Sequence, residues 1–102
     1  MTQLSEVQET LLTQLSTINP FFREIYGVQA IVVMNDGLTV RLHTWKDRKS
    51  TNIDITYNAG LDVYQVTGYR IEGSTRVRQL QKFPEVYFDE LYDFIQKLQK
   101  EA

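Results

Sequence analysis

The chain contains no cysteine, and it has no apolar run approaching the ~18 residues of a membrane span. Without cysteine there is no disulfide, no thiolate nucleophile and no thiolate metal ligand, which fits a reducing compartment. The first residues, 1–6, lack the basic and apolar regions of a signal peptide. We therefore expect a soluble, cytoplasmic protein.

Histidine is also scarce, since His43 is the only one. A Ser-His-carboxylate site needs a serine within reach of that ring, but the four serines fall on the predicted first helix or in turns, outside any nucleophile-elbow pattern. Zinc sites need several His or Cys ligands, and the scattered glycines form no phosphate-binding loop. We therefore expect no enzyme activity, no catalytic residue and no cofactor.

Carboxylates are the remaining candidate metal ligands. Glu85, Asp89 and Asp93 recur every four residues, with Glu90 nearby, and hard cations bind such oxygen clusters. On a helix, however, this row lies opposite the apolar stripe, which is where a solvated face belongs. We expect no metal site.

Charge is unevenly distributed along the chain, although its net value is only −2. Residues 37–83 hold eight Lys or Arg against four acids, a balance of +4. Residues 1–36 and 84–102 each carry −3, from one base against four acids and from two bases against five. The pattern indicates a basic sheet flanked by acidic helices, which complement each other or leave a basic face free to bind.

The 102 residues are predicted to form one domain, 1–102. Apolar residues at three- and four-residue intervals predict a helix over 3–18, with Ser5 and Gln8 at capping-box spacing. Pro20 opens a short helix over 20–26, which Gly27 ends. A second apolar stripe predicts the last helix over 84–100.

Between these helices, residues 28–83 have the alternation and turn residues of antiparallel strands. Turns are predicted at 35–37 and 58–60, where Asn and Gly are two residues apart. Gly68 lies inside a long predicted strand, 61–71, and suggests a bulge or bend. The polar segment 75–83 suits a sheet edge, which completes a sheet of about five strands.

The first hairpin leaves its register open between two alternatives. If residues 35–37 form a three-residue loop with a bulge, Ile31 and Val33 share a face with Arg41. A two-residue turn of Asp36 and Gly37 shifts the pairing by one and places Ile31 and Val33 in the core. In either register the segment 28–34 is apolar on both sides, so both of its faces need covering.

The fold class that follows is α+β. It consists of an N-terminal helix, an antiparallel meander of about five strands and a C-terminal helix, in a two-layer helix-on-sheet packing. We favour both helices on one sheet face. The alternative, one helix on each face, covers the second face without a partner.

An uncovered second face favours a non-enzymatic protein-interaction module. Apolar residues combined with Tyr, Trp and Arg are typical of interface cores, and a two-fold homodimer is the simplest way to bury them. The interface is expected on the second sheet face or on the last helix. The candidate interface residues are Ile31, Val33, Arg41, His43, Trp45, Tyr64, Val66, Phe88 and Tyr92.

The alternative function is binding of single-stranded nucleic acid by the basic sheet and hairpin surface around Trp45. Basic side chains neutralise phosphates and aromatic rings stack on bases. The candidate contacts are Trp45, Lys46, Arg48, Lys49, Arg70, Arg76, Arg78 and Lys82. A small-ligand pocket is the third interpretation of the uncovered face.

Overall fold

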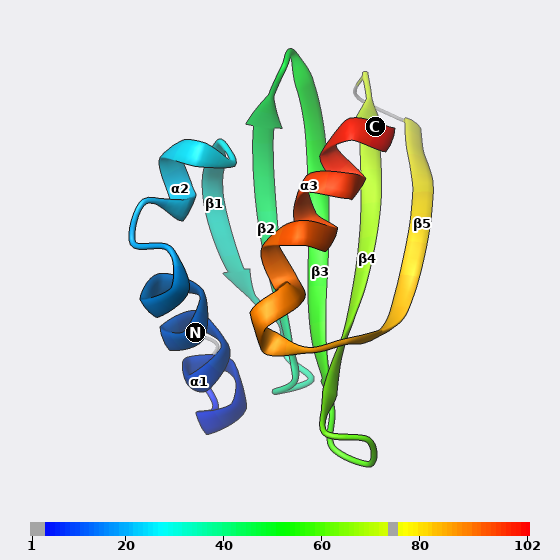
Figure 1. Cartoon of the computed structure of the whole chain (residues 1–102). Helices are drawn as coiled ribbons and strands as arrows, with labels where there is room; N and C mark the ends of the chain where they lie inside the picture. The colour runs from blue at the N-terminus through cyan, green and yellow to red at the C-terminus, as the bar shows by residue number, and fades with distance from the viewer. Residues whose placement is uncertain (1–3, 74–75) are drawn as a thin grey trace.

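The computed structural model describes residues 4–73 and 76–102. These residues form α1 (Glu6–Ile18), α2 (Phe22–Ile25), β1 (Val28–Val33), β2 (Thr39–Lys46), β3 (Lys49–Asn58), β4 (Val63–Glu72), β5 (Arg76–Val86), the 3-10 helix η1 (Phe88–Glu90) and α3 (Leu91–Glu101) (Figure 1). The strands make one antiparallel sheet in the order β1-β2-β3-β4-β5. The predicted α+β meander is therefore confirmed. The first helix was predicted from residue 3, which lies outside the described residues, but residues 4 and 5 are described and precede α1. The start of the predicted edge strand, residue 75, also lies outside the described residues.

The helices pack against one face of the sheet, as the favoured arrangement predicted. In Figure 1, α3 crosses in front of the central strands, and α1 and α2 lie toward β1. The core between the layers is closed by side chains that are almost fully buried: Leu11, Leu15, Val40, Leu42, Ile53, Ile55, Val66, Leu91, Ile95 and Leu98. In the described part of the chain, no helix lies on the opposite face.

Helix α1 begins with the capping box that its sequence predicts. The Ser5 hydroxyl accepts a hydrogen bond from the Gln8 backbone N–H, and the Gln8 side chain accepts one from the Ser5 N–H, both at 3.1 Å. These bonds satisfy two backbone donors that a helix start leaves free. Gln8 is itself fully buried, and its Nε2 donates to the carbonyl oxygens of Met34 and Thr39, each at 2.9 Å. The same residue thus caps the helix and ties it to the first hairpin.

The three-residue-loop register of the first hairpin is wrong. Val33 pairs with Val40 and Ile31 with Leu42, which is the pairing of the two-residue alternative. Ile31 and Val33 therefore lie on the helix-covered face, because side chains alternate along a strand.

Asp36 explains this choice of register. Its Oδ1 accepts hydrogen bonds from the backbone N–H groups of Leu38 and Thr39 at 2.9 and 2.8 Å, and its Oδ2 accepts one from the Thr39 hydroxyl at 2.6 Å. These bonds stabilise the charged carboxylate and hold the pKa of Asp36 below its ordinary value, and the bond from the Thr39 hydroxyl has the largest effect. Local side-chain bonding of this kind, together with Gln8, fixes where the turn ends.

The next two hairpins depend on left-handed backbone positions. Asp47 and Arg48 connect the pair Lys46–Lys49 with φ of 54° and 62°, as a two-residue hairpin with two positive φ angles requires. The β3–β4 loop ends at Asp62, whose φ is 54°. Aspartate enters this region more readily than most residues, because its short polar side chain bonds locally.

Gly68 marks an irregularity in the sheet, as its sequence position suggested. The pairing of β4 with β5 shifts between Thr67 and Tyr69. A Cβ added at Gly68 would lie 3.0 Å from Leu98 Cδ2 and 3.2 Å from Leu80 Cδ1. A side chain at this position would therefore have to displace Leu98 and Leu80, so glycine suits the close approach of α3, and its φ angle is not the reason.

The last helix begins later than predicted. Residues 84–86 continue β5, η1 follows, and α3 starts only at Leu91. Proline is tolerated here because β5 is an edge strand, where no neighbouring strand needs its N–H. The predicted row of acids is consequently divided, with Glu85 on a strand, Asp89 in η1 and Asp93 on α3.

Candidate functional site

No helix of residues 4–73 and 76–102 covers the sheet face opposite α1 and α3, and we call it the open face. Strand alternation and register assign its residues. They include Ala30, Val32, Thr39, Arg41, His43, Trp45, Ser50, Asn52, Asp54, Thr56, Gln65, Thr67, Tyr69, Ile71, Val77, Gln79 and Lys82.

Polar pairs occupy the middle of the open face. Arg41 on β2 donates from Nε and Nη2 to the two carboxylate oxygens of Asp54 on β3, at 2.7 and 2.9 Å. Hydrogen bonding to Asp54 is the main reason that the pKa of Arg41 lies above its ordinary value. His43 Nδ1 and Asn52 Oδ1 lie 2.6 Å apart and form a hydrogen bond between β2 and β3. The middle of the face is therefore internally satisfied.

One end of the open face is apolar. Trp45, Ser50, Ile71 and Val77 are register partners and form a row across β2 to β5. Trp45 is 53% exposed and Val77 is 63% exposed, while Ile71 is half-buried. Ser50 is the smallest side chain of the row and lies between Trp45 and Ile71. We call these four residues the apolar row.

The structure divides the predicted interface residues between the two faces of the sheet. Arg41, His43 and Trp45 lie on the open face, as predicted. The other predicted sheet residues, Ile31, Val33, Tyr64 and Val66, face the helices, and Tyr64 and Val66 are 6% and 0% exposed. Placing those four on the second face is therefore a wrong prediction. It followed from the wrong register in β1 and from the wrong side chains being assigned outward in β4.

The two aromatic candidates from the last predicted helix also separate. Tyr92 stacks on Tyr26 with ring centroids 5.0 Å apart, and its hydroxyl donates to the Leu15 carbonyl at 2.6 Å. Tyr92 therefore joins α3 to α1, and its side chain is not free to bind a partner. Phe88 lies in η1 and is 52% exposed, so only this one of the two remains accessible.

The predicted nucleic-acid contacts do not form one surface. Trp45 and Lys82 lie on the open face, whereas alternation places Lys46, Lys49, Arg70, Arg76 and Arg78 on the helix side. Arg48 lies in the β2–β3 turn. Lys46 donates to the Ile25 carbonyl at 2.7 Å, and Arg78 pairs with Glu72 at 3.1 Å. A single strand on the open face would thus meet few of the eight residues, and nucleic-acid binding stays a prediction with little geometric support.

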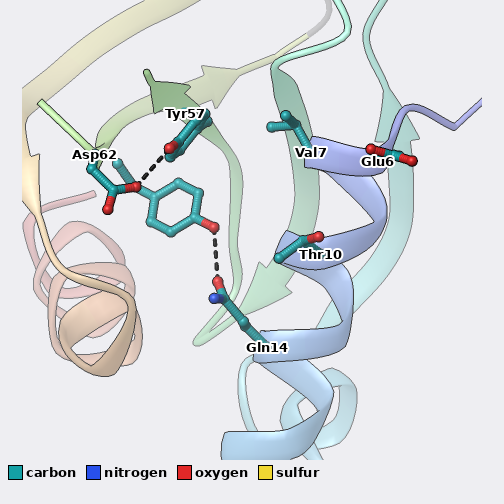
Figure 2. A pocket seen from close by; sticks show the side chains of 7 residues that line it. Glu6, Val7, Thr10, Gln14, Tyr57 and Asp62 are labelled. Atoms are coloured by element: carbon teal, nitrogen blue, oxygen red, sulfur yellow. Dashed lines mark hydrogen bonds between the residues drawn. The ribbon is translucent and has the colours of Figure 1, made fainter. Parts of the chain in front are cut away.

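Sequence reasoning missed Tyr69, Ile71 and Val77 as open-face residues. The available signal was the alternation of side chains along β4 and β5. Once the register is known, this alternation places the three residues on the same face as Trp45. It also missed a groove between α1 and the β3–β4 hairpin, of about 290 Å³ (Figure 2). Val7, Thr10 and Gln14 line it from α1, and Tyr57, Asp62 and Tyr64 line it from the hairpin. No sequence motif marks this groove, because its two sides are about fifty residues apart.

Comparison with protein-family models, curated proteins and solved structures gives no match to this chain. Among the residues that the structure describes, no group of three or more His, Cys, Asp or Glu is placed to hold a metal ion. The helices over that same part of the chain are too short or too polar to cross a bilayer.

Proposed function

We propose that this chain is a non-enzymatic protein-interaction module that self-associates through the open face. One observation carries the proposal: the described helices pack against one face of a five-stranded sheet, and Trp45 and Val77 of the apolar row are exposed on the other. The cysteine-free composition supports a cytoplasmic location.

Sheet-on-sheet packing of two copies is the arrangement that this face favours. Two sheets pack about 10 Å apart, with side chains from the facing surfaces interdigitating. In a two-fold dimer the same residues meet from both copies. Tryptophan, the residue at position 45, is among the residue types most enriched in energetically dominant contacts.

The polar pairs limit where the contact is centred. Moving the Arg41–Asp54 pair out of water costs free energy that its own two hydrogen bonds only partly offset. The favourable contribution therefore comes from the apolar row, and the pairs at Arg41 and His43 contribute register and specificity at its margin. This arrangement predicts a dimer of moderate affinity, centred on Trp45 and Val77.

The last helix gives weaker support as an interface. Its apolar residues Leu91, Ile95 and Leu98 are fully buried in the core, and Tyr92 is bonded to α1. An interface there would depend on Tyr87 and Phe88, which are exposed before α3 begins. We therefore place self-association on the sheet.

Sedimentation equilibrium across micromolar concentrations tests the proposal. The wild-type chain is expected to dimerise, and Trp45→Ser or Val77→Ser to raise the dimer Kd by about tenfold or more, as loss of a dominant contact does. Phe21→Ser is the matched control, because Phe21 is 66% exposed but precedes α2 in the helix layer. A wild-type chain that remains monomeric throughout, or a control that weakens the dimer equally, would refute self-association through this face.

A further inference from the structure

The groove between α1 and the β3–β4 hairpin has walls from two separate layers of the fold. Figure 2 shows Val7 and Thr10 projecting from α1 toward the hairpin, with Tyr57 and Asp62 on the other side. The Tyr64 hydroxyl donates to Gln14 Oε1 at 2.7 Å and bridges the two walls. The groove is therefore held by packing and by a cross-layer hydrogen bond.

Two aromatic rings form a corner in this groove. The centroids of Tyr57 and Tyr64 are 5.6 Å apart, and the ring planes meet at 59°. Both hydroxyls are already used as donors, Tyr57 to Asp62 Oδ1 at 2.6 Å and Tyr64 to Gln14. The rings are thus fixed in orientation. Tyr57 is partly exposed and offers its π-face to a ligand, whereas Tyr64 is only 6% exposed and packs behind it.

The charge around this corner has one sign. Asp62 lines the groove beside the rings, Glu6 lies at its α1 side, and no Lys or Arg of the described chain lines it. The Asp62 carboxylate, through its hydrogen bond and its charge, raises the pKa of Tyr57. The pKa of Tyr64 is raised by burial and, to a smaller extent, by the neighbouring Tyr57 and Asp62. In the described part of the chain, Asp62 Oδ2 receives no hydrogen bond.

We propose that this groove binds an organic cation, an alkylammonium or guanidinium group on an aliphatic stem. A cation is attracted to the faces of aromatic rings and gains a hydrogen-bonded ion pair from a free carboxylate oxygen. Val7 and the Thr10 methyl group offer apolar contact to the stem. An anion would be repelled by Asp62 and Glu6, and a neutral ligand could donate a hydrogen bond to them but would form no ion pair.

Amide NMR spectra of the full chain, titrated with n-butylammonium chloride, test the site directly. Saturating shifts are expected at Thr10, Tyr57 and Asp62, and n-butanol at the same concentrations should leave these amides unmoved. A lysine-containing peptide and its norleucine counterpart identify the source of the cation. Tighter binding of the lysine peptide than of butylammonium indicates a basic side chain of a partner, and equal binding indicates a free amine. Equal shifts from butylammonium and butanol would overturn the proposal.

Asp62→Asn isolates the charge. Asparagine keeps an oxygen that accepts from Tyr57 and tolerates the positive φ at this position, so the fold is expected to persist. Binding of butylammonium should weaken about fivefold, as expected for loss of one partly exposed ion pair. Asp47→Asn is the control, since Asp47 also has a positive φ but lies in the β2–β3 turn. Unchanged affinity in Asp62→Asn would overturn the cation site and leave self-association through the open face untouched.

Discussion

Arg41 and Asp54 face each other across β2 and β3 as a two-pronged ion pair, with both carboxylate oxygens bonded to the guanidinium. The side chains are 33% and 15% exposed, so water still screens part of the attraction. Such pairs contribute less to stability than their geometry suggests. The more important effect of the pair is on orientation, because the two hydrogen bonds from the planar guanidinium fix both side chains against the sheet.

The first prediction concerns the energy of this pair. Arg41→Met and Asp54→Asn should each lower the free energy of unfolding by about 1 kcal/mol, with a coupling of about 0.5–1 kcal/mol in the double variant. Urea unfolding of the four proteins, all at the same low protein concentration, measures both quantities. A loss above about 3 kcal/mol from either single variant would mean that the pair behaves as a buried one.

The second prediction concerns Gln8, which is fully buried and bonded to two carbonyl groups of the first hairpin. Gln8→Met keeps the length of the side chain but removes its donor, so the Met34 and Thr39 carbonyls each lose a partner. We expect the free energy of unfolding to fall by about 2 kcal/mol.

Thr13→Met is the control for Gln8, because Thr13 is exposed on the same helix, and we expect it to change stability by less than about 0.5 kcal/mol. Denaturant unfolding distinguishes the two. Equal effects would show that methionine on α1, rather than the lost bonds, is responsible.

The third prediction concerns the contact between Gly68 and α3. A methyl group at position 68 would press on Leu98 and Leu80 at 3.0–3.2 Å, and both are buried. Gly68→Ala should therefore cost about 1–3 kcal/mol, as overpacking of a core does. Gly60→Ala is the control, because its nearest neighbour would be Asn58 Oδ1 at 3.4 Å, an ordinary contact. If both variants unfold at the same urea concentration as the wild type, the prediction is wrong, and α3 can move away from the sheet without a cost in folding free energy.

The element order was predictable because each element has a local signal. The capping box at Ser5 and Gln8, the stop at Gly27 and the alternation of β3 all depend on residues close in sequence. Gly68 also gave its signal locally, although the reason for it, the approach of Leu98, is thirty residues away.

The register and the site depend on distant residues, and this is why sequence reasoning lost them. Residues 35–37 suit either turn, and the choice depends on the Asp36 bonds and on Gln8 reaching the hairpin from α1. One residue of slip was enough to move Ile31 and Val33 to the other face. The groove joins Gln14 to Tyr64 across fifty residues, so no local pattern could reveal it.

The fourth prediction concerns pH and the bond from Tyr92 to Leu15. Burial, and to a smaller extent Tyr26, raise the pKa of Tyr92 above its ordinary value of 10.0. Above about pH 10 the unfolded chain releases this proton while the folded chain keeps it, so stability falls as pH rises. The contribution of the raised Tyr92 pKa to the free energy of unfolding is fully present below about pH 10 and is lost progressively above it. Burial also raises the pKa of Tyr26 and Tyr64, so these residues act in the same direction.

Tyr92→Phe separates the hydrogen bond from the titration. At pH 7 the variant should be less stable by about 1 kcal/mol, because the Leu15 carbonyl loses its 2.6 Å donor. At pH 11 the wild type has lost part of its Tyr92 contribution, whereas the variant has no group there to titrate, so the difference should shrink. Urea unfolding at the two pH values measures it. A difference that stays constant or grows would mean that Tyr92 ionises as readily in the folded chain as in the unfolded one, and that α1 and α3 are less firmly joined than the 2.6 Å bond implies.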